Sequence, residues 1–282
     1  MATILKGMAV VNAMKKQMQS DVEKLSAQGI VPTLGIVRVG EREDDIAYER
    51  GATKRCQGIG VAVKNFVLPN DATQAQLISV IDEVNAAQDI HGVLLFRPLP
   101  KHIDDAAVCA RLDPKKDVDG ITDISMVDIY AGGQRGYAPC TAQACMEILK
   151  HYQYDVTGKR AVVIGRSLVV GKPVTHLLIA QNATVTVCHT RTVDMPSIAK
   201  QADILIVAAG RAGVIGEEYL LGGQVVIDVG INVDEKGKLC GDVDFAAAEN
   251  KDIAITPVPG GVGTVTTSVL VRHVIDAALK TL

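Results

Sequence analysis

The stretch Ala161-Val-Val-Ile-Gly-Arg-Ser-Leu-Val-Val-Gly-Lys-Pro173 decides the fold of this 282-residue chain. Its apolar run is short and β-branched, as a strand covered on both faces requires. Gly165 permits a tight turn and Gly171 a close backbone approach, while Pro173 suits a first helical turn because it has no N–H to lose there. A helix that begins after such a turn offers free backbone N–H groups to a phosphate. The stretch therefore predicts a phosphate-binding strand–turn–helix unit.

The residues after the next strand indicate which nucleotide would bind. The glycine spacing is not G-x-G-x-x-G, so an ordinary β–α turn remains an alternative on this stretch alone. Residues 183–188 read as a second strand, followed by His189, Thr190 and Arg191. At such a strand tip a carboxylate accepts the ribose 2′-hydroxyl of NAD, whereas arginine accommodates the 2′-phosphate of NADP. Arg166 and Arg191, with no carboxylate at the tip, favour NADP.

Composition limits the classes of protein to which the chain can belong. Hydrophobic residues make up 48% and charged residues 22%, which is typical of a globular chain with one large or two medium domains. A net charge of −3 and only 3% aromatic residues, with no tryptophan, argue against nucleic-acid binding. No uninterrupted apolar run is long enough to cross a bilayer, and no secretory leader is visible. We expect a cytoplasmic protein that binds neither nucleic acid nor membrane.

The six cysteines give no sign of a metal site. They include no C-x-x-C pair, and no histidines stand at zinc-ligand spacing beside them. We interpret them as reduced and mostly buried thiols. A nucleophilic role for Cys140 is the alternative, but the sequence locates no histidine partner for it.

Hydrophobic periodicity predicts alternating helices and strands along the whole chain. The predicted strands span residues 33–39, 61–68, 93–96, 161–164, 183–188, 204–208, 225–229 and 253–256. The predicted helices span residues 5–28, 43–57, 73–87, 103–111 and 141–151, and a last helix follows residue 263. Repeated β–α units imply parallel sheets with right-handed crossovers. We expect two α/β domains with a cleft between them.

Several longer strings occur in an order that identifies a family. They are Lys116-Asp-Val-Asp-Gly120, Pro139-Cys-Thr141, Gly165-Arg-Ser-Leu-Val-Val-Gly-Lys-Pro173, Ala183-Thr-Val-Thr-Val-Cys-His189, Val226-Ile-Asp-Val-Gly-Ile-Asn232 and Thr256-Pro-Val-Pro-Gly-Gly-Val-Gly263. From end to end the chain resembles the bacterial type of the bifunctional methylenetetrahydrofolate dehydrogenase/methenyltetrahydrofolate cyclohydrolase family. The resemblance implies a homodimer of two-domain α/β subunits. Residues 1–138 and 266–282 would form the folate-binding catalytic domain, and residues 139–265 an NADP-binding Rossmann domain.

The resemblance also implies roles for particular residues. Tyr48 would pack against the pterin and Asp119 would hydrogen-bond its aminopyrimidine edge, which makes these two the catalytic pair. The other positions implied to contact substrate are Leu99, Pro259, Gly260 and Gly263. The positions implied to contact NADP are Gly165, Arg166, Ser167, Thr190, Arg191 and Ile231. From the residues alone, the favoured interpretations are a turn residue for Asp119 and an ordinary aromatic on a helix face for Tyr48.

Two positions depart from the family pattern. The family has Tyr-x-x-x-Lys, and that lysine drives the cyclohydrolase step, but here the helix reads Tyr48-Glu-Arg-Gly-Ala52. Lys54 lies roughly 200° further around the helix and cannot replace it. The glutamine that orients the family's lysine is Phe96 here. Loss of a long side chain at 52 leaves a hole that a ring at 96 can fill.

The two family reactions make different demands on the protein. Hydride transfer from the methylene carbon needs orientation in a dry site but no acid or base. Cyclohydrolysis needs a general acid–base such as lysine. We therefore expect NADP-dependent oxidation of 5,10-methylenetetrahydrofolate, polyglutamylated in the cell, with weak or absent cyclohydrolase activity. We also expect a separate cyclohydrolase in the same pathway. The alternatives are a fully bifunctional enzyme that makes 10-formyltetrahydrofolate, and a non-catalytic folate- or nucleotide-binding protein.

Overall fold

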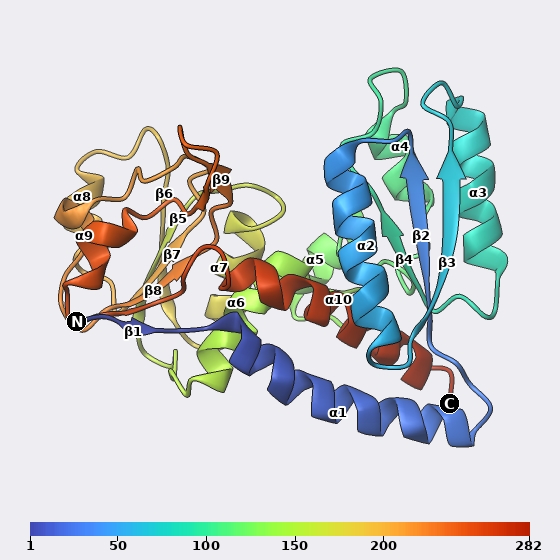
Figure 1. Cartoon of the computed structure of the whole chain (residues 1–282), viewed down its shortest axis with the longest axis horizontal. Helices are drawn as coiled ribbons and strands as arrows, with labels where there is room; N and C mark the ends of the chain where they lie inside the picture. The colour runs from blue at the N-terminus through green and yellow to red at the C-terminus, as the bar shows by residue number, and fades with distance from the viewer. The chain divides into compact units, whose positions relative to one another are not determined.

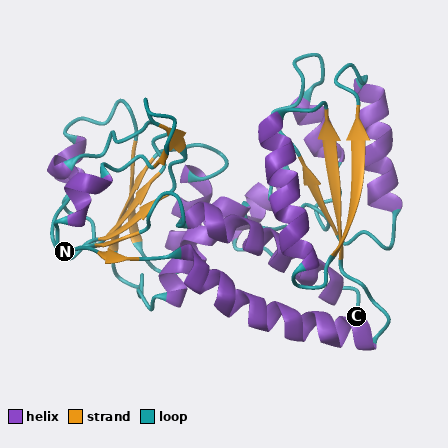
Figure 2. Ribbon diagram, viewed as in Figure 1, coloured by secondary structure: helices purple, strands orange, loops and turns teal.

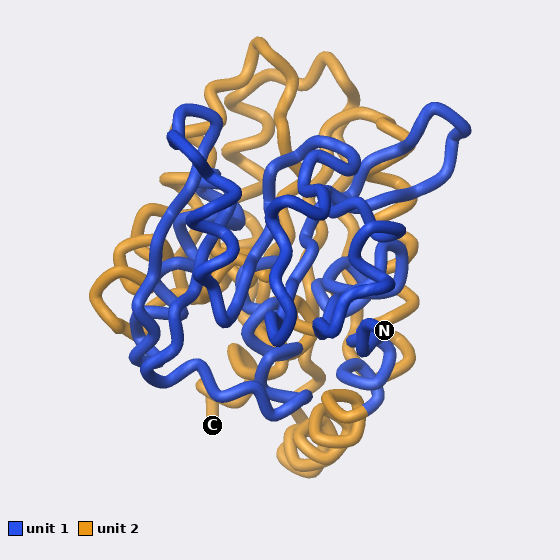
Figure 3. Tube along the Cα trace, turned by 90° about the vertical axis from the view of Figure 1, so that its left-hand side faces the viewer, with its two compact units in different colours: residues 1–12, 141–266 blue, residues 13–140, 267–282 orange.

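The chain divides into two compact units, which Figure 3 traces in different colours. The computed structural model describes residues 1–282. Unit 1 consists of residues 1–12 and 141–266, and unit 2 of residues 13–140 and 267–282. The boundaries fall within three helices, which are α1 (Gly7–Ala27), α6 (Cys140–His151) and α10 (Val262–Leu279).

The N-terminus differs from the expected domain division. Residues 1–12 pack with unit 1, whereas the expected folate-binding domain begins at residue 1. The reason is β1 (Thr3–Ile4), which pairs in parallel with β11 (Ala254–Ile255). The backbone N–H of Thr3 donates to Ile253 and that of Leu5 to Ile255, both over 2.8 Å. A two-residue strand carries no periodicity, so the sequence pattern missed it.

Unit 1 contains a six-stranded parallel sheet in the order β1-β11-β8-β7-β5-β6. Its main strands are β5 (Arg160–Ile164), β6 (Thr184–Cys188), β7 (Ile204–Val207) and β8 (Val225–Asp228). The strand order reverses at β5, because β6 and β7 pair with its opposite edges. In open parallel sheets, ligands bind beyond the carboxyl ends of the strands at such a switch point.

Short elements complete unit 1. Helix α7 (Gly171–Ala180) follows β5, and α8 (Met195–Ala199), the 3-10 helix η1 (Glu217–Tyr219) and α9 (Phe245–Glu249) lie between later strands. An antiparallel pair is formed by β9 (Asn232–Val233) and β10 (Leu239–Cys240). Sequence periodicity did not reveal α8, α9 or this hairpin, because each is five residues or shorter.

Unit 2 contains a three-stranded parallel sheet in the order β3-β2-β4, and in Figure 2 helices flank these strands. The strands are β2 (Thr33–Val39), β3 (Ala62–Leu68) and β4 (Gly92–Leu95), and β2, in the centre, is buried at every residue. Helices α2 (Glu43–Gln57), α3 (Gln74–Ala86) and α4 (Asp105–Arg111) lie around the sheet in Figure 1. Unit 2 also contains α5 (Asp123–Ala131). The two parallel sheets confirm the expected α/β class.

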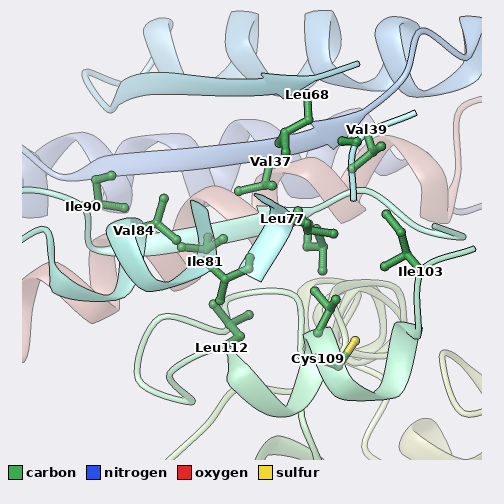
Figure 4. Close-up of a cluster of buried hydrophobic side chains, with 14 residues drawn as sticks. Val37, Val39, Leu68, Leu77, Ile81, Val84, Ile90, Ile103, Cys109 and Leu112 are labelled. Carbon is green, nitrogen blue, oxygen red and sulfur yellow. The ribbon is translucent and has the colours of Figure 1, made fainter. Parts of the chain in front are cut away.

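The core of unit 2 lies where α3 and α4 meet the sheet. Leu77, Ile81 and Val84 of α3 are fully buried in one cluster with Val37 of β2 and Leu112 after α4 (Figure 4). Helix α3 begins after Thr73, which forms a capping box with Gln76. The cluster therefore joins one face of the sheet to helices with the expected apolar spacing.

One helix has the length and hydropathy of a membrane span. It is α10, and 61% of that window is buried inside the protein. Buried helices of ordinary cores pass the same test of length and composition, so α10 is a core helix.

Candidate active site

The glycine turn after β5 folds back tightly on the sheet. Gly165 has φ +127°, and a Cβ atom there would lie 2.3 Å from the carbonyl oxygen of Ala208. A Cβ atom on Gly171 would lie 2.3 Å from the carbonyl oxygen of Gly165. Ser167 Oγ accepts a hydrogen bond from the Val170 N–H over 3.1 Å. Both positions therefore require a residue without a Cβ atom. The loop leads directly into the start of α7, as the sequence predicted.

A cavity of about 250 Å³ lies at the carboxyl ends of β5 and β7. Three of the predicted cofactor positions line it, namely Gly165, Arg166 and Thr190, and Arg211 lines it too. The other lining residues are Ile164, His189, Met195, Ala208, Ala209, Val214, Ile215 and Tyr219. No carboxylate is among them. Arg191 does not line the cavity, and its backbone N–H donates to His189 Nδ1 over 3.2 Å.

This cavity fits an adenine nucleotide that carries an additional phosphate. Its walls combine apolar side chains with two guanidinium groups, and the glycine turn leaves the backbone open to approach. Arg211 is a functional candidate that the sequence reasoning missed. The available signal was its place three residues after the predicted strand that ends at Ala208, an edge at which nucleotide contacts gather.

A second cavity of unit 1, of about 190 Å³, lies between the segments 228–231 and 257–264. It brings together Ile231, a predicted cofactor position, with the predicted substrate positions Pro259, Gly260 and Gly263. A Cβ atom on Gly263 would lie 3.2 Å from Ile231 Cδ1. Residues about 30 apart in the sequence thus share one small pocket.

Two buried aspartates hold the loops around these cavities. Asp228, at the end of β8, accepts backbone N–H groups of Gly230, Asp242 and Val243 over 2.9–3.0 Å. Burial raises the pKa of Asp228 to about 6, although these hydrogen bonds favour the charged form. Asp242 in turn accepts the N–H groups of three consecutive residues after β7, which are Ala209, Gly210 and Arg211, over 2.6–3.0 Å. No local sequence pattern indicates this pair.

In unit 2, Lys116, Asp117 and Gly120 fix the backbone that carries the Asp119 carboxylate. Lys116 Nζ donates to three carbonyl oxygens at the end of α3 over 2.6–2.8 Å. The fully buried Asp117 accepts hydrogen bonds from the N–H and hydroxyl groups of Thr122, which caps α5. Gly120 has φ +69°, and a Cβ atom there would lie 2.6 Å from the Pro139 nitrogen. Asp119 is therefore held between a fixed turn and the start of α6.

Asp119 and Tyr48 act on each other electrostatically. Burial raises the pKa of Asp119 to about 6, while hydrogen bonds from the thiol and backbone of Cys140 and the charge of Arg97 favour its ionised form. Burial and the Asp119 carboxylate raise the pKa of the Tyr48 hydroxyl well above its usual value. The structure thus brings the two predicted catalytic residues together in unit 2. Leu99, also predicted to contact substrate, packs half-buried against the core cluster of that unit.

Cys140 has a histidine neighbour that the sequence did not reveal. Its Sγ lies 3.8 Å from His273 Nδ1, which is also 2.9 Å from the carbonyl oxygen of Val118. Burial and the adjacent Asp119 raise the pKa of this thiol far above its usual value. The thiolate needed for a nucleophile is therefore disfavoured. The thiol donates to the carbonyl oxygen of Val118, the residue before Asp119, over 3.3 Å.

The two positions that we expect to depart from the family pattern both lie in the interior. Ala52 is fully buried on α2, and Phe96 is 9% exposed just after β4. The Phe96 ring meets the Tyr48 ring edge to face at a centroid distance of 5.8 Å. Lys54 is exposed. The cation that acts on Asp119 is Arg97, which pairs with Asp105.

Comparison with known proteins agrees with this arrangement. Residues 5–119 match the family described as tetrahydrofolate dehydrogenase/cyclohydrolase, catalytic domain, and residues 139–282 match its NAD(P)-binding domain. The bifunctional protein FolD of Carboxydothermus hydrogenoformans is 50% identical over 279 residues, which are 98% of this chain and 97% of that protein.

Solved structures give the same result. The bifunctional FolD methylenetetrahydrofolate dehydrogenase/cyclohydrolase of Campylobacter jejuni superimposes with a TM-score of 0.97 at 36% identity, with both chains covered completely. The Trypanosoma brucei enzyme, solved with NADP and an inhibitor, has a TM-score of 0.92 at 34% identity, with 99% of this chain and 98% of that chain covered. The chain belongs to the tetrahydrofolate dehydrogenase/cyclohydrolase family. It is an NADP-dependent enzyme with a Rossmann-like nucleotide-binding domain.

Proposed function

We propose that the chain oxidises 5,10-methylenetetrahydrofolate to 5,10-methenyltetrahydrofolate. The observation that carries this proposal is the Asp119 carboxylate, which is anchored at the start of α6 and electrostatically coupled to the Tyr48 hydroxyl. A carboxylate accepts hydrogen bonds from an aminopyrimidine, and an aromatic ring packs against a pterin. Membership of the family supports tetrahydrofolate as the substrate.

The reaction needs little chemistry from the protein. NADP, when bound, supplies the acceptor for the hydride that leaves the methylene carbon. The lone pairs of the two flanking nitrogens stabilise the resulting cation, so no side chain has to exchange a proton. The work of Tyr48 and Asp119 is to orient the pterin, and the work of the Gly165 turn and Arg166 is to bind the nucleotide phosphates. Exclusion of water protects the cation from hydrolysis.

We further propose that cyclohydrolase activity is weak or absent. Water attack on the methenyl cation requires a group that exchanges a proton near neutral pH. Ala52 offers none, and Phe96 packs against Tyr48 at the position of the family's glutamine. Arg97 is the cation that acts on Asp119, but a guanidinium does not release its proton in a protein.

The comparisons instead favour the presence of the cyclohydrolase activity. The relatives that are 45–50% identical are named bifunctional, and on that ground a fully bifunctional dehydrogenase/cyclohydrolase fits them better than a dehydrogenase alone. We therefore keep the bifunctional enzyme, which would make 10-formyltetrahydrofolate, as the second candidate. In that case a group other than a lysine at position 52 activates the water. The family assignment removes the support for a non-catalytic binding protein.

Two assays on one preparation test these proposals. NADPH formation from 5,10-methylenetetrahydrofolate tests the dehydrogenase, with NAD in a parallel reaction. Decay of 5,10-methenyltetrahydrofolate, with and without protein, tests the cyclohydrolase. We expect NADPH formation, and methenyl decay at the spontaneous rate. Brisk catalysed decay selects the bifunctional enzyme, and absence of NADPH formation contradicts the dehydrogenase.

The cellular setting is also a proposal. We propose a cytoplasmic homodimer that accepts polyglutamylated folates and works beside a separate cyclohydrolase. Support comes from the resemblance and, for the separate enzyme, from Ala52 and Phe96. Light scattering on the purified protein measures the oligomeric state, and a monomer at micromolar concentration contradicts the dimer.

A further inference from the structure

The cavity beyond β5 and β7 contains a cation that the family resemblance did not assign. Arg211 and Arg166 both line this cavity, and no carboxylate does. Neither guanidinium forms an ion pair, whereas arginines elsewhere in the protein, such as Arg38 and Arg272, pair with carboxylates. Two unpaired guanidinium groups on one cavity repel each other unless an anion lies between them.

We propose that Arg211 forms, together with Arg166, the clamp for the 2′-phosphate of NADP, an inference that rests on the proposed use of this cofactor. A guanidinium binds phosphate oxygens through two parallel N–H donors, so a pair of them suits a phosphate dianion. Arg191, which the sequence favoured for this role, does not line the cavity. Arg211 thus distinguishes NADP from NAD.

The backbone at Arg211 is held independently of its side chain. The N–H groups of Ala209, Gly210 and Arg211 donate to the carboxylate of Asp242, which is fully buried. Asp242 also accepts from the side-chain amide of Asn232 over 2.9 Å. Because this anchor uses main-chain groups, replacing the Arg211 side chain leaves the loop in place. A change in ligand affinity then reports on the guanidinium.

A matched control is available on the same sheet. Arg160 is an exposed arginine at the start of β5, at the opposite end of the strand from Gly165 and Arg166. It pairs with Asp203 at 3.7 Å. Its substitution changes the net charge by the same amount as a substitution of Arg211 but touches no wall of the cavity.

The experiment measures equilibrium binding by calorimetry to the full chain without folate, at low ionic strength. The probes are 2′,5′-ADP and 5′-AMP, which differ by the 2′-phosphate. In Arg211→Gln the affinity for 2′,5′-ADP should fall about 10-fold, while 5′-AMP affinity changes less than about 2-fold. Arg211→Lys and Arg191→Gln should each lose less affinity for 2′,5′-ADP than Arg211→Gln, and Arg160→Gln should bind like the wild type. Circular dichroism confirms that each variant is folded.

Three results overturn the inference. The first is an unchanged affinity of Arg211→Gln for 2′,5′-ADP. The second is an equal loss of affinity for both probes in that variant. The third is a larger loss of 2′,5′-ADP affinity in Arg191→Gln than in Arg211→Gln. If the wild type itself binds 2′,5′-ADP no better than 5′-AMP, the proposed use of NADP fails. That failure is distinguishable, because it appears before any variant is made.

Discussion

The ring of Phe96 stands edge-on to the ring of Tyr48, with an angle of 84° between their planes and 5.8 Å between their centroids. Ala52 follows one helical turn after Tyr48 and is completely buried. Edge-to-face pairs contribute about 0.5–1.5 kcal/mol beyond their buried area. The aromatic pair is therefore part of the core of unit 2, at the position where the family resemblance places a polar glutamine.

Restoring both polar residues should restore the second activity. In the double variant Ala52→Lys, Phe96→Gln we expect catalysed hydrolysis of methenyltetrahydrofolate about 100-fold above the spontaneous rate, because a general acid–base is supplied. Ala52→Lys alone should gain much less, since Phe96 still occupies the position of the orienting amide. The assay follows methenyl decay, with NADPH formation as the control. A double variant that is folded, oxidises methylenetetrahydrofolate and still does not hydrolyse would show that other residues decide the loss.

Substrate affinity should depend on pH through Asp119. The pKa of Asp119 is raised to about 6, so its carboxylate is ionised above that pH and protonated below it. We expect KM for methylenetetrahydrofolate to rise as the pH falls below about 6, because the protonated group loses acceptor capacity for the aminopyrimidine. Asp119→Asn should raise KM about 10-fold at pH 7.5 and remove the pH dependence. Initial rates between pH 5 and 8 measure both effects, and a persistent pH dependence in the variant would assign it to another group.

Cys140 should set the pH at which this change occurs. Its thiol hydrogen bond favours the ionised form of Asp119. Removing the donor in Cys140→Ala should raise the pKa of Asp119, so that KM begins to rise at a higher pH. Cys140→Ser keeps a donor and should behave like the wild type. If both variants only lower the melting temperature and leave the KM–pH curve in place, Cys140 is merely a core residue.

Two glycine-to-alanine substitutions should have opposite effects on stability. Gly165→Ala places a methyl group 2.3 Å from a carbonyl oxygen at a positive φ, and should cost about 2 kcal/mol or more and abolish nucleotide binding. Gly51 lies inside α2 with no contact near its Cβ direction. Gly51→Ala should stabilise by roughly 0.5–1 kcal/mol. Urea unfolding measures both, and tolerance of Gly165→Ala would contradict the geometry of the turn.

The stability of the protein should fall below about pH 6.5 because of His91. Its Nδ1 accepts the backbone N–H of Thr33 over 3.2 Å, and burial lowers its pKa. The unfolded chain therefore takes up a proton at a higher pH than the folded one, and stability decreases as the pH drops through that interval. His91→Asn keeps an acceptor without titrating. Its free energy of unfolding should change less between pH 7 and 5 than that of the wild type, and an equal change would exclude His91 as the cause.

Local patterns were sufficient for the regular elements. The β-branched run before Gly165, the apolar spacing of α3 and the capping box at Thr73 each depend on neighbours within a few residues, so they were readable from the chain. Helices α5, α8 and α9 and the two-residue strands β1, β9 and β10 were not. Helix α5 has only nine residues, and its one clear signal was the cap at Thr122.

The amino-acid order by itself determined the α/β class, the glycine turn that requires residues without a Cβ, and the absence of lysine at position 52, because these follow from residue identity and close neighbours. Only the tertiary structure decided that Arg211 rather than Arg191 lines the nucleotide cavity, that Asp242 holds a loop 32 residues away, and that Cys140 lies against Asp119. Such pairings depend on how distant segments pack, and nothing in a local pattern encodes them.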